Sequence, residues 1–218
     1  ERTLEQVAYL TTLTPQELIN HQQDVADKVL KALSTIDPNC VIAGGAVADW
    51  HFGKPAKDLD VYFFYKDVGD YMFKANPDVD GEYFWYGERT EGYFQEMADK
   101  LKAMFGEDVI IKCGENIPQG YDQNQRLLCV FDMVIDGVEV QFMQTNHKYA
   151  REIVKHFPVN MSRCYRGWDV ADPINYQWRK EGSYTVFDRL FRLGEHLKVL
   201  SMSDEIYLNP DKYKAKMV

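Results

Sequence analysis

The stretch that decides the fold is residues 42–63, which read IAGGAVADWHFGKPAKDLDVYF. Its apolar start predicts a short buried strand, and Gly44-Gly45 predicts a tight turn from this strand into a short helix. The alternating residues at its end predict a second strand. Because side chains alternate across a strand, Asp58 and Asp60 share one face, and the apolar residues between and after them anchor the other face in a core.

This combination is suited to binding a polyphosphate together with a divalent metal ion. Glycines without side chains allow backbone N–H groups to approach a triphosphate closely, and a helix start adds partial positive charge. Two carboxylates on one strand face can jointly hold Mg²⁺ ions that bridge phosphate oxygens. Alone, Gly-Gly is typical of a turn and Asp-x-Asp of a solvated strand face, but their joint occurrence favours a binding site.

The segments Gly44-Gly45-Ala46-Val47-Ala48-Asp49, Gly53-Lys54-Pro55 and Asp58-Leu59-Asp60 resemble the signature of the nucleotidyltransferase superfamily with the polymerase-beta-like fold. They look most like the head motif of CCA-adding and poly(A) polymerases and of small phage and bacterial relatives. Many CCA-adding enzymes carry Arg before the Asp, where this chain has Ala48.

The resemblance implies an α/β (α+β) fold, with a mixed β-sheet backed by helices and a small C-terminal helical extension. It implies metal-dependent transfer of an NMP from an NTP to a hydroxyl, with release of pyrophosphate. In that role Gly44 and Gly45 hold the triphosphate, and Asp58 and Asp60 are catalytic and bind Mg²⁺ or Mn²⁺. The acceptor is left open among an RNA 3′ end, a protein hydroxyl and a small molecule.

The resemblance also implies a third carboxylate from a later strand, for catalysis and for metal binding. Glu139 is the first choice because it precedes Gln141 on the same strand face, and Asp132 is the second. The usual acidic position could instead align with Gln141, which cannot ionise, and activity would then be weak or absent. The alternative function is therefore a catalytically impaired protein that binds a nucleotide or another protein.

Further nucleotide contacts are expected outside the central stretch. His156-Phe157-Pro158-Val159-Asn160-Met161 resembles the Asp-Phe-Thr-Ile-Asn-Ala motif of the same group, which lies beside the nucleotide. By this resemblance Asn160 and Arg163 face the triphosphate or the sugar. Lys54, just before the two acids, could contact phosphates, although a lysine in a loop is usually solvated.

Two arginines near the C-terminus lie on one face of a predicted final helix. Arg189 and Arg192 are three residues apart and therefore neighbours on the helix surface. They form either a phosphate-binding stripe or ordinary salt bridges with Asp188 and Glu195. Both interpretations stay open at the level of sequence.

The composition and the net charge of the chain exclude some classes of function. The chain has 218 residues, 45% of them hydrophobic, and a net charge of −9, which predicts one globular domain that does not bind extended double-stranded DNA. No apolar run approaches the roughly 20 residues that span a bilayer, and the N-terminus does not resemble a signal peptide. We therefore expect a cytoplasmic protein without membrane contact, with buried reduced thiols at Cys40, Cys113, Cys129 and Cys164.

The order of predicted elements divides the chain into a catalytic domain, 1–165, and a helical extension, 166–218. Within the first we expect an irregular insertion, or lid, over 66–89. The predicted helices cover about 15–33, 46–51, 90–105, 146–157 and 184–200. The predicted strands cover about 40–43, 58–65, 109–112, 127–135, 138–145 and 159–165, with a hairpin turn at Asp136-Gly137.

Overall fold

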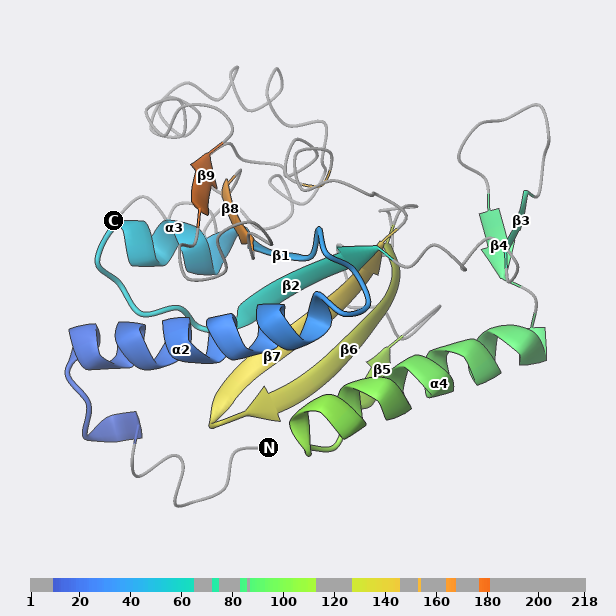
Figure 1. The fold of residues 1–218 in the computed structure, drawn as a ribbon, viewed down its shortest axis with the longest axis horizontal. Helices are drawn as coiled ribbons and strands as arrows, with labels where there is room; N and C mark the ends of the chain where they lie inside the picture. The colour runs from blue at the N-terminus through green and yellow to red at the C-terminus, as the bar shows by residue number, and fades with distance from the viewer. Residues whose placement is uncertain are drawn as a thin grey trace, which may run out of the picture.

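The computed structural model describes residues 10–64, 72–74, 83–85, 87–112, 127–145, 153, 164–167 and 177–180 (Figure 1). Three helices and nine strands are described in this part of the chain. In chain order they are α2 (Pro15–Leu33), β1 (Val41–Ala43), α3 (Gly45–His51), β2 (Leu59–Phe64), β3 (Met72–Lys74), β4 (Tyr83–Trp85), α4 (Gly87–Phe105), β5 (Ile110–Lys112), β6 (Leu127–Ile135), β7 (Val138–Thr145), β8 (Cys164–Gly167) and β9 (Gln177–Lys180).

Seven strands form one mixed sheet in the order β5-β6-β7-β2-β1-β8-β9. Only β2 and β7 run parallel, and every other neighbouring pair in this order is antiparallel. Figure 1 shows α2 and α4 lying across the same side of the sheet. The predicted mixed sheet backed by helices is therefore confirmed.

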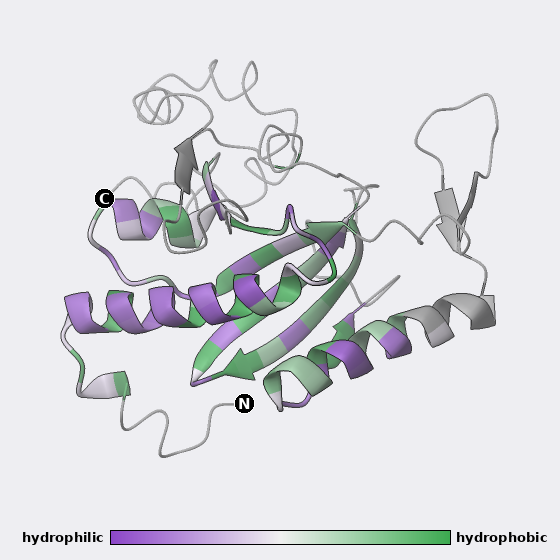
Figure 2. Cartoon of the chain, viewed as in Figure 1, coloured by the Kyte–Doolittle hydropathy of each residue, from purple (hydrophilic) through white to green (hydrophobic). Residues whose placement is uncertain are grey.

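Helix α2 begins and ends where the sequence predicts. Thr14 is its N-cap and accepts a hydrogen bond from the Glu17 amide at 3.2 Å, and Pro15 occupies the first turn, where its missing N–H costs nothing. Figure 2 shows hydrophilic residues along the outer side of α2 and hydrophobic residues along the strands behind it. The helix is thus amphipathic and packs its apolar stripe on the sheet.

The main core lies between the helices and this face of the sheet. Phe131 of β6 is fully buried, with its ring centroid 6.4 Å from that of Phe63 and 6.3 Å from that of Phe94. Phe105 of α4 stacks on Phe142 of β7, with centroids 5.6 Å apart. These contacts join β2, β6 and β7 to α4, so the strands that carry the candidate site are anchored from behind.

The β6–β7 hairpin has the predicted bounds and the predicted turn. Asp136 and Gly137 have φ angles of 49° and 79°, which are the left-handed values that a two-residue hairpin turn requires. Helix α2 holds this turn, because His21 Nε2 lies 2.8 Å from the Asp136 carbonyl oxygen and Lys28 Nζ lies 3.2 Å from its carboxylate. The turn fixes the register of both strands.

The region predicted as an irregular insertion contains regular structure. Strands β3 and β4 pair antiparallel, with Phe73 opposite Phe84, and α4 begins at Gly87 rather than at Thr90. Aromatic residues favour strands, and here the aromatic runs pair with each other instead of forming irregular chain. The prediction of a wholly irregular segment over 66–89 is therefore wrong for its described residues.

Some predictions fall wholly or partly outside the described residues. These are the helices over 146–157, described only at Ile153, and over 184–200, the first part of the strand over 159–165, and Cys113. Of the predicted C-terminal extension, residues 166–167 and 177–180 are described, and they are strands of the main sheet. Among the described helices, none combines the length and the hydropathy that crossing a membrane requires.

Three of the four cysteines, Cys40, Cys129 and Cys164, are described, and all three are buried and outside disulfide bonds. Burial raises the pKa of the Cys40 thiol far above its ordinary value of 9.0, and the nearby Asp37 carboxylate raises it further. The thiol therefore stays protonated in the folded protein. In the unfolded chain it ionises above about pH 9.

This difference predicts how alkaline pH lowers stability. Because the folded-state pKa is raised, the contribution of Cys40 is complete below pH 9 and is lost as the pH rises, by about 1.4 kcal/mol per pH unit. Urea unfolding of the wild type and of Cys40→Ala at pH 7, 9 and 10 measures it. The wild type should lose about 1 kcal/mol more than the variant between pH 9 and 10, because the unfolded thiol is already half ionised at pH 9, and equal losses would contradict the prediction.

Candidate functional site

The structure brings the glycine turn and the two aspartates together. Strands β1 and β2 are antiparallel, with Val41 opposite Tyr62 and Ile42 opposite Val61. The end of β1, where Gly44-Gly45 opens α3, therefore lies beside the start of β2, which contains Asp60 and is immediately preceded by Asp58. The two motifs of the sequence thus meet at one end of these two central strands.

The backbone of Gly44 has a conformation that only glycine adopts readily. Its φ and ψ angles are 88° and −134°. Its N–H donates to the Cys164 carbonyl at 3.0 Å, and the Cys164 thiol donates to the Gly44 carbonyl at 3.6 Å. Because the Gly44 N–H already bonds to β8, the role of Gly44 is to shape the turn. The N–H of Gly45 is at the first position of α3 and therefore has no acceptor within the helix.

The two glycines should therefore respond differently to alanine. Gly44→Ala places a side chain in a strained conformation and should cost about 1–3 kcal/mol of folding free energy. At Gly45 an added Cβ meets nothing within 4 Å, so Gly45→Ala should change stability by less than about 0.5 kcal/mol. Urea unfolding of both variants measures the difference, and equal destabilisation would contradict this geometry.

A row of polar side chains crosses three strands on the sheet face opposite to the main core. Asp60 of β2 is paired with Gln141 of β7, which is in turn paired with Asp132 of β6. Paired residues share a face, so the three side chains project on the same side. Glu139 lies two residues before Gln141, is exposed and belongs to the same face as Asp58. Of the two predicted candidates for the third carboxylate, Glu139 thus lies on the strand adjacent to β2, and Asp132 lies one strand further away.

Asp132 has a partner that the sequence did not indicate. Lys112, from the edge strand β5, forms an ion pair with Asp132 Oδ2. The other oxygen, Asp132 Oδ1, is buried and has no hydrogen-bond partner among the described residues. One oxygen of the carboxylate is thus neutralised and the other is left able to accept a bond from a ligand.

These donors fit a hard divalent cation that shares its coordination with a substrate. Carboxylate and amide oxygens are what Mg²⁺ prefers, and it is usually held by one or two carboxylates together with substrate phosphates. Within the described part of the chain, no group of three or more His, Cys, Asp or Glu residues is close enough to hold a metal ion alone. The arrangement therefore suits Asp58 and Asp60 as protein ligands, with phosphate oxygens completing the shell.

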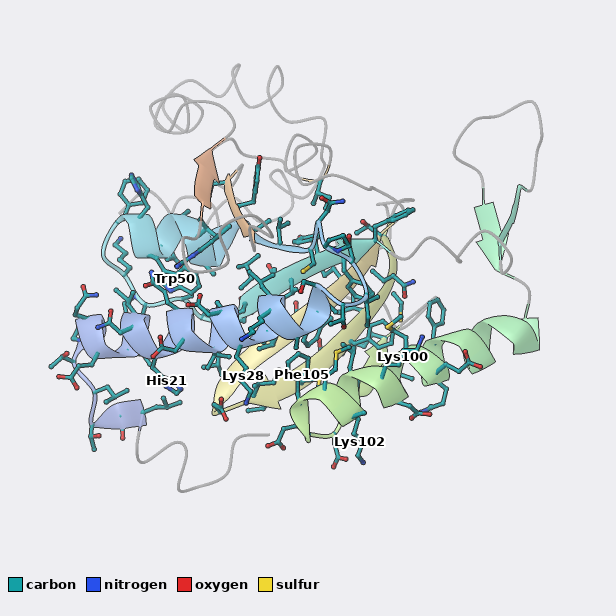
Figure 3. The ribbon with its side chains drawn as sticks, in the orientation of Figure 1. His21, Lys28, Trp50, Lys100, Lys102 and Phe105 are labelled. Atoms are coloured by element: carbon teal, nitrogen blue, oxygen red, sulfur yellow. The ribbon has the colours of Figure 1, made fainter. Side chains whose placement is uncertain are left out.

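The connection from α3 to β2 is held by a buried glutamine of α2. Gln22, which is only 5% exposed, donates from Nε2 to the Ala56 carbonyl at 2.7 Å. Its Oε1 accepts from the Ala56 amide at 2.8 Å and from the Trp50 indole at 3.0 Å. Figure 3 shows Trp50 extending from α3 toward α2. Gln22 was not among the residues predicted from the sequence, although it is a polar residue on the apolar stripe between Leu18 and Val25.

Of the remaining predicted contacts, one is described. Lys54 is exposed in the connection between α3 and β2, and its amide donates to the Asp49 carbonyl at 2.8 Å. The others, Asn160, Arg163, Arg189 and Arg192, lie outside the described residues and stay predictions.

Similar proteins were found among solved structures. A tRNA-processing enzyme in an apo form is 15% identical at a TM-score of 0.41, and the match covers 71% of this chain and 31% of that chain. The CCA-adding enzyme of Thermotoga maritima complexed with tRNA is 9% identical at a TM-score of 0.39, covering 70% and 29%. Terminal uridylyl transferase 4 from Trypanosoma brucei with bound UTP and UMP is 10% identical at a TM-score of 0.32, covering 64% and 42%.

The chain spans about a third of the length of the first two structures. No protein-family model matches it, and no curated protein matches it in sequence. A CCA-adding enzyme and a terminal uridylyl transferase are thus among the solved structures that this chain resembles.

Proposed function

We propose that this chain is a metal-dependent nucleotidyltransferase, which moves an NMP from an NTP to a hydroxyl acceptor and releases pyrophosphate. The observation that supports it is the β1–β2 register, which sets Gly44-Gly45 beside Asp58 and Asp60 on a strand anchored from behind by the core. A glycine turn offers backbone N–H groups to phosphates, and the carboxylates offer oxygens to Mg²⁺ or Mn²⁺.

In this proposal the chain binds the nucleotide and orients it. The turn at Gly45 receives the triphosphate, Lys54 contributes positive charge, and Asp58 and Asp60 hold the divalent ion. When bound, that ion neutralises the phosphates and stabilises the charge that develops during transfer. The acceptor hydroxyl oxygen forms a bond to the α-phosphorus. The bond between the α-phosphorus and the oxygen that bridges it to the β-phosphorus breaks, so pyrophosphate leaves. Glu139 or Asp132 accepts the hydroxyl proton.

A direct assay tests the proposal without knowledge of the acceptor. The full chain is incubated with Mg²⁺ or Mn²⁺ and each α-labelled NTP, in the presence of an RNA pool, protein extract or small hydroxyl compounds. We expect pyrophosphate release and transfer of the label, both abolished in Asp58→Ala with Asp60→Ala. Full activity of that double variant would show that the proposal is wrong.

One observation favours a second candidate, a nucleotide-binding protein with impaired catalysis. The residue paired with Asp60 on β7 is Gln141, which cannot ionise, and Glu139 is exposed one row away. If neither Glu139 nor Asp132 accepts the proton, the chain binds NTP but transfers it poorly. Calorimetry showing NTP binding without turnover over the whole acceptor panel would favour this candidate, and rapid pyrophosphate release would exclude it.

A further inference from the structure

A single side chain of α2 controls the segment that leads into the candidate site. Residues 52–57 connect α3 to β2 without regular structure, and most of their side chains are exposed. Within this connection Ala56 is an exception, because it is 8% exposed and its amide and carbonyl both bond to Gln22. The same Gln22 oxygen binds the Trp50 indole of α3.

The amide of Gln22 matches this environment in only one orientation. Its oxygen faces two N–H donors and its nitrogen faces one carbonyl acceptor, so turning the amide over would lose all three bonds. The partners are 28 and 34 residues away in sequence, and the side chain is 5% exposed. A buried network with each bond made defines one geometry, whereas the same network with one member removed leaves costly unpaired groups.

The position of Asp58 follows from this network. Asp58 is two residues after Ala56, which Gln22 holds, and one residue before Leu59, which is fully buried in the main core. Its backbone therefore lies between two fixed points. At the other end of the connection, backbone bonds link the chain to the end of α3, such as that from the Lys54 amide to the Asp49 carbonyl.

From this geometry we infer that Gln22 is a positioning residue for the metal-binding carboxylates, although it contributes no atom to the site. The inference rests on the proposed function, because it assigns to Gln22 the placement of Asp58 relative to Asp60 and to the glycine turn. Loss of the glutamine frees the 52–57 connection, and the site then has to be ordered when the ion and the nucleotide bind. The affinity for the metal ion should therefore fall by more than the loss of folding stability in the same variant would explain.

The test measures Mn²⁺ binding to the full chain by electron paramagnetic resonance, with and without an NTP. Gln22→Met keeps the size of the side chain and removes all three bonds, and Trp50→Phe removes one bond and leaves Ala56 held. The matched control is Gln144→Met, which removes a fully buried glutamine amide at the far end of β7, beside Phe63 rather than beside Asp58. All variants are compared at a temperature at which circular dichroism shows each to be folded.

We expect Gln22→Met to raise the Kd for Mn²⁺ about tenfold, the loss typical of removing a residue that orients metal ligands. Trp50→Phe should have a smaller effect, and Gln144→Met should lower the melting temperature without changing the Kd. Amide hydrogen exchange should also become faster at Ala56 in Gln22→Met. If Gln22→Met and Gln144→Met bind Mn²⁺ as tightly as the wild type, the positioning role is wrong while the proposed function stands. If the wild type does not bind Mn²⁺, or if Asp60→Asn binds it equally well, both are wrong.

Discussion

Replacement of Asp60 by asparagine should reduce nucleotidyl transfer about a thousandfold. Asparagine keeps the size of the side chain and one oxygen, so the change removes the charge and little else. Loss of an anionic ligand is expected to cost about 4 kcal/mol of transition-state stabilisation, and each factor of ten in rate is about 1.4 kcal/mol. The measurement is kcat/KM for pyrophosphate release at saturating Mg²⁺.

The folded state should survive this change, which makes the variant informative. Asp60 lies on the sheet face opposite to the main core, between Leu59 and Val61, both of which are fully buried on the other face. Asp108→Asn is the matched control, because Asp108 is an exposed aspartate that precedes the edge strand β5, three strands away from β2 in the sheet order, and it pairs with Lys102 at 2.8 Å. An Asp60→Asn activity within about threefold of that control would remove Asp60 from the reaction.

The largest effect on stability is expected from Phe131→Ala. Phe131 is fully buried and contacts the rings of Phe63 and Phe94, so truncation leaves a cavity where β2, β6 and α4 meet. Such substitutions typically cost about 3–5 kcal/mol. For a chain of this length that corresponds to a fall of about 10 °C in Tm, measured by calorimetry.

Phe52→Ala provides the contrast for this prediction. Phe52 is 50% exposed at the end of α3, and its removal should change the free energy of unfolding by less than about 1 kcal/mol. A similar loss in both variants would mean that the main core lies elsewhere. The Mn²⁺ affinity of Phe52→Ala should remain that of the wild type.

Local signals in the sequence predicted the elements of the fold well. The β6–β7 hairpin was predicted to the residue, because an Asp-Gly turn between two apolar alternating runs admits few other structures. The cap at Thr14 and the start at Pro15 defined α2 in the same way. The start of α4 was misplaced by three residues, because helix starts without a strong capping residue are poorly defined by local sequence.

The site was predictable only in part, because it is assembled by contacts between distant residues. Period-two alternation predicted Asp58 and Asp60 on one face; in the structure Asp60 lies within β2 and Asp58 immediately precedes this strand. No local pattern indicates that β2 pairs in parallel with β7, and this pairing sets Gln141 beside Asp60. Likewise, no spacing of residues in the sequence predicts that Lys112 pairs with Asp132. Gln22 did leave a signal, a polar residue within an apolar helical stripe, which is uncommon without a buried partner.

The parallel contact between β2 and β7 also has a consequence for folding and for engineering. Residues 65–137 separate these central neighbours, so the β6–β7 hairpin can form early from its own turn, whereas β2 must join it after a long loop has closed. Loop-closure entropy grows only logarithmically, and doubling a loop costs about 0.6 kcal/mol. An inserted domain between β2 and α4 should therefore slow assembly of the sheet modestly while leaving its centre intact, which makes this connection a practical point for attaching a reporter.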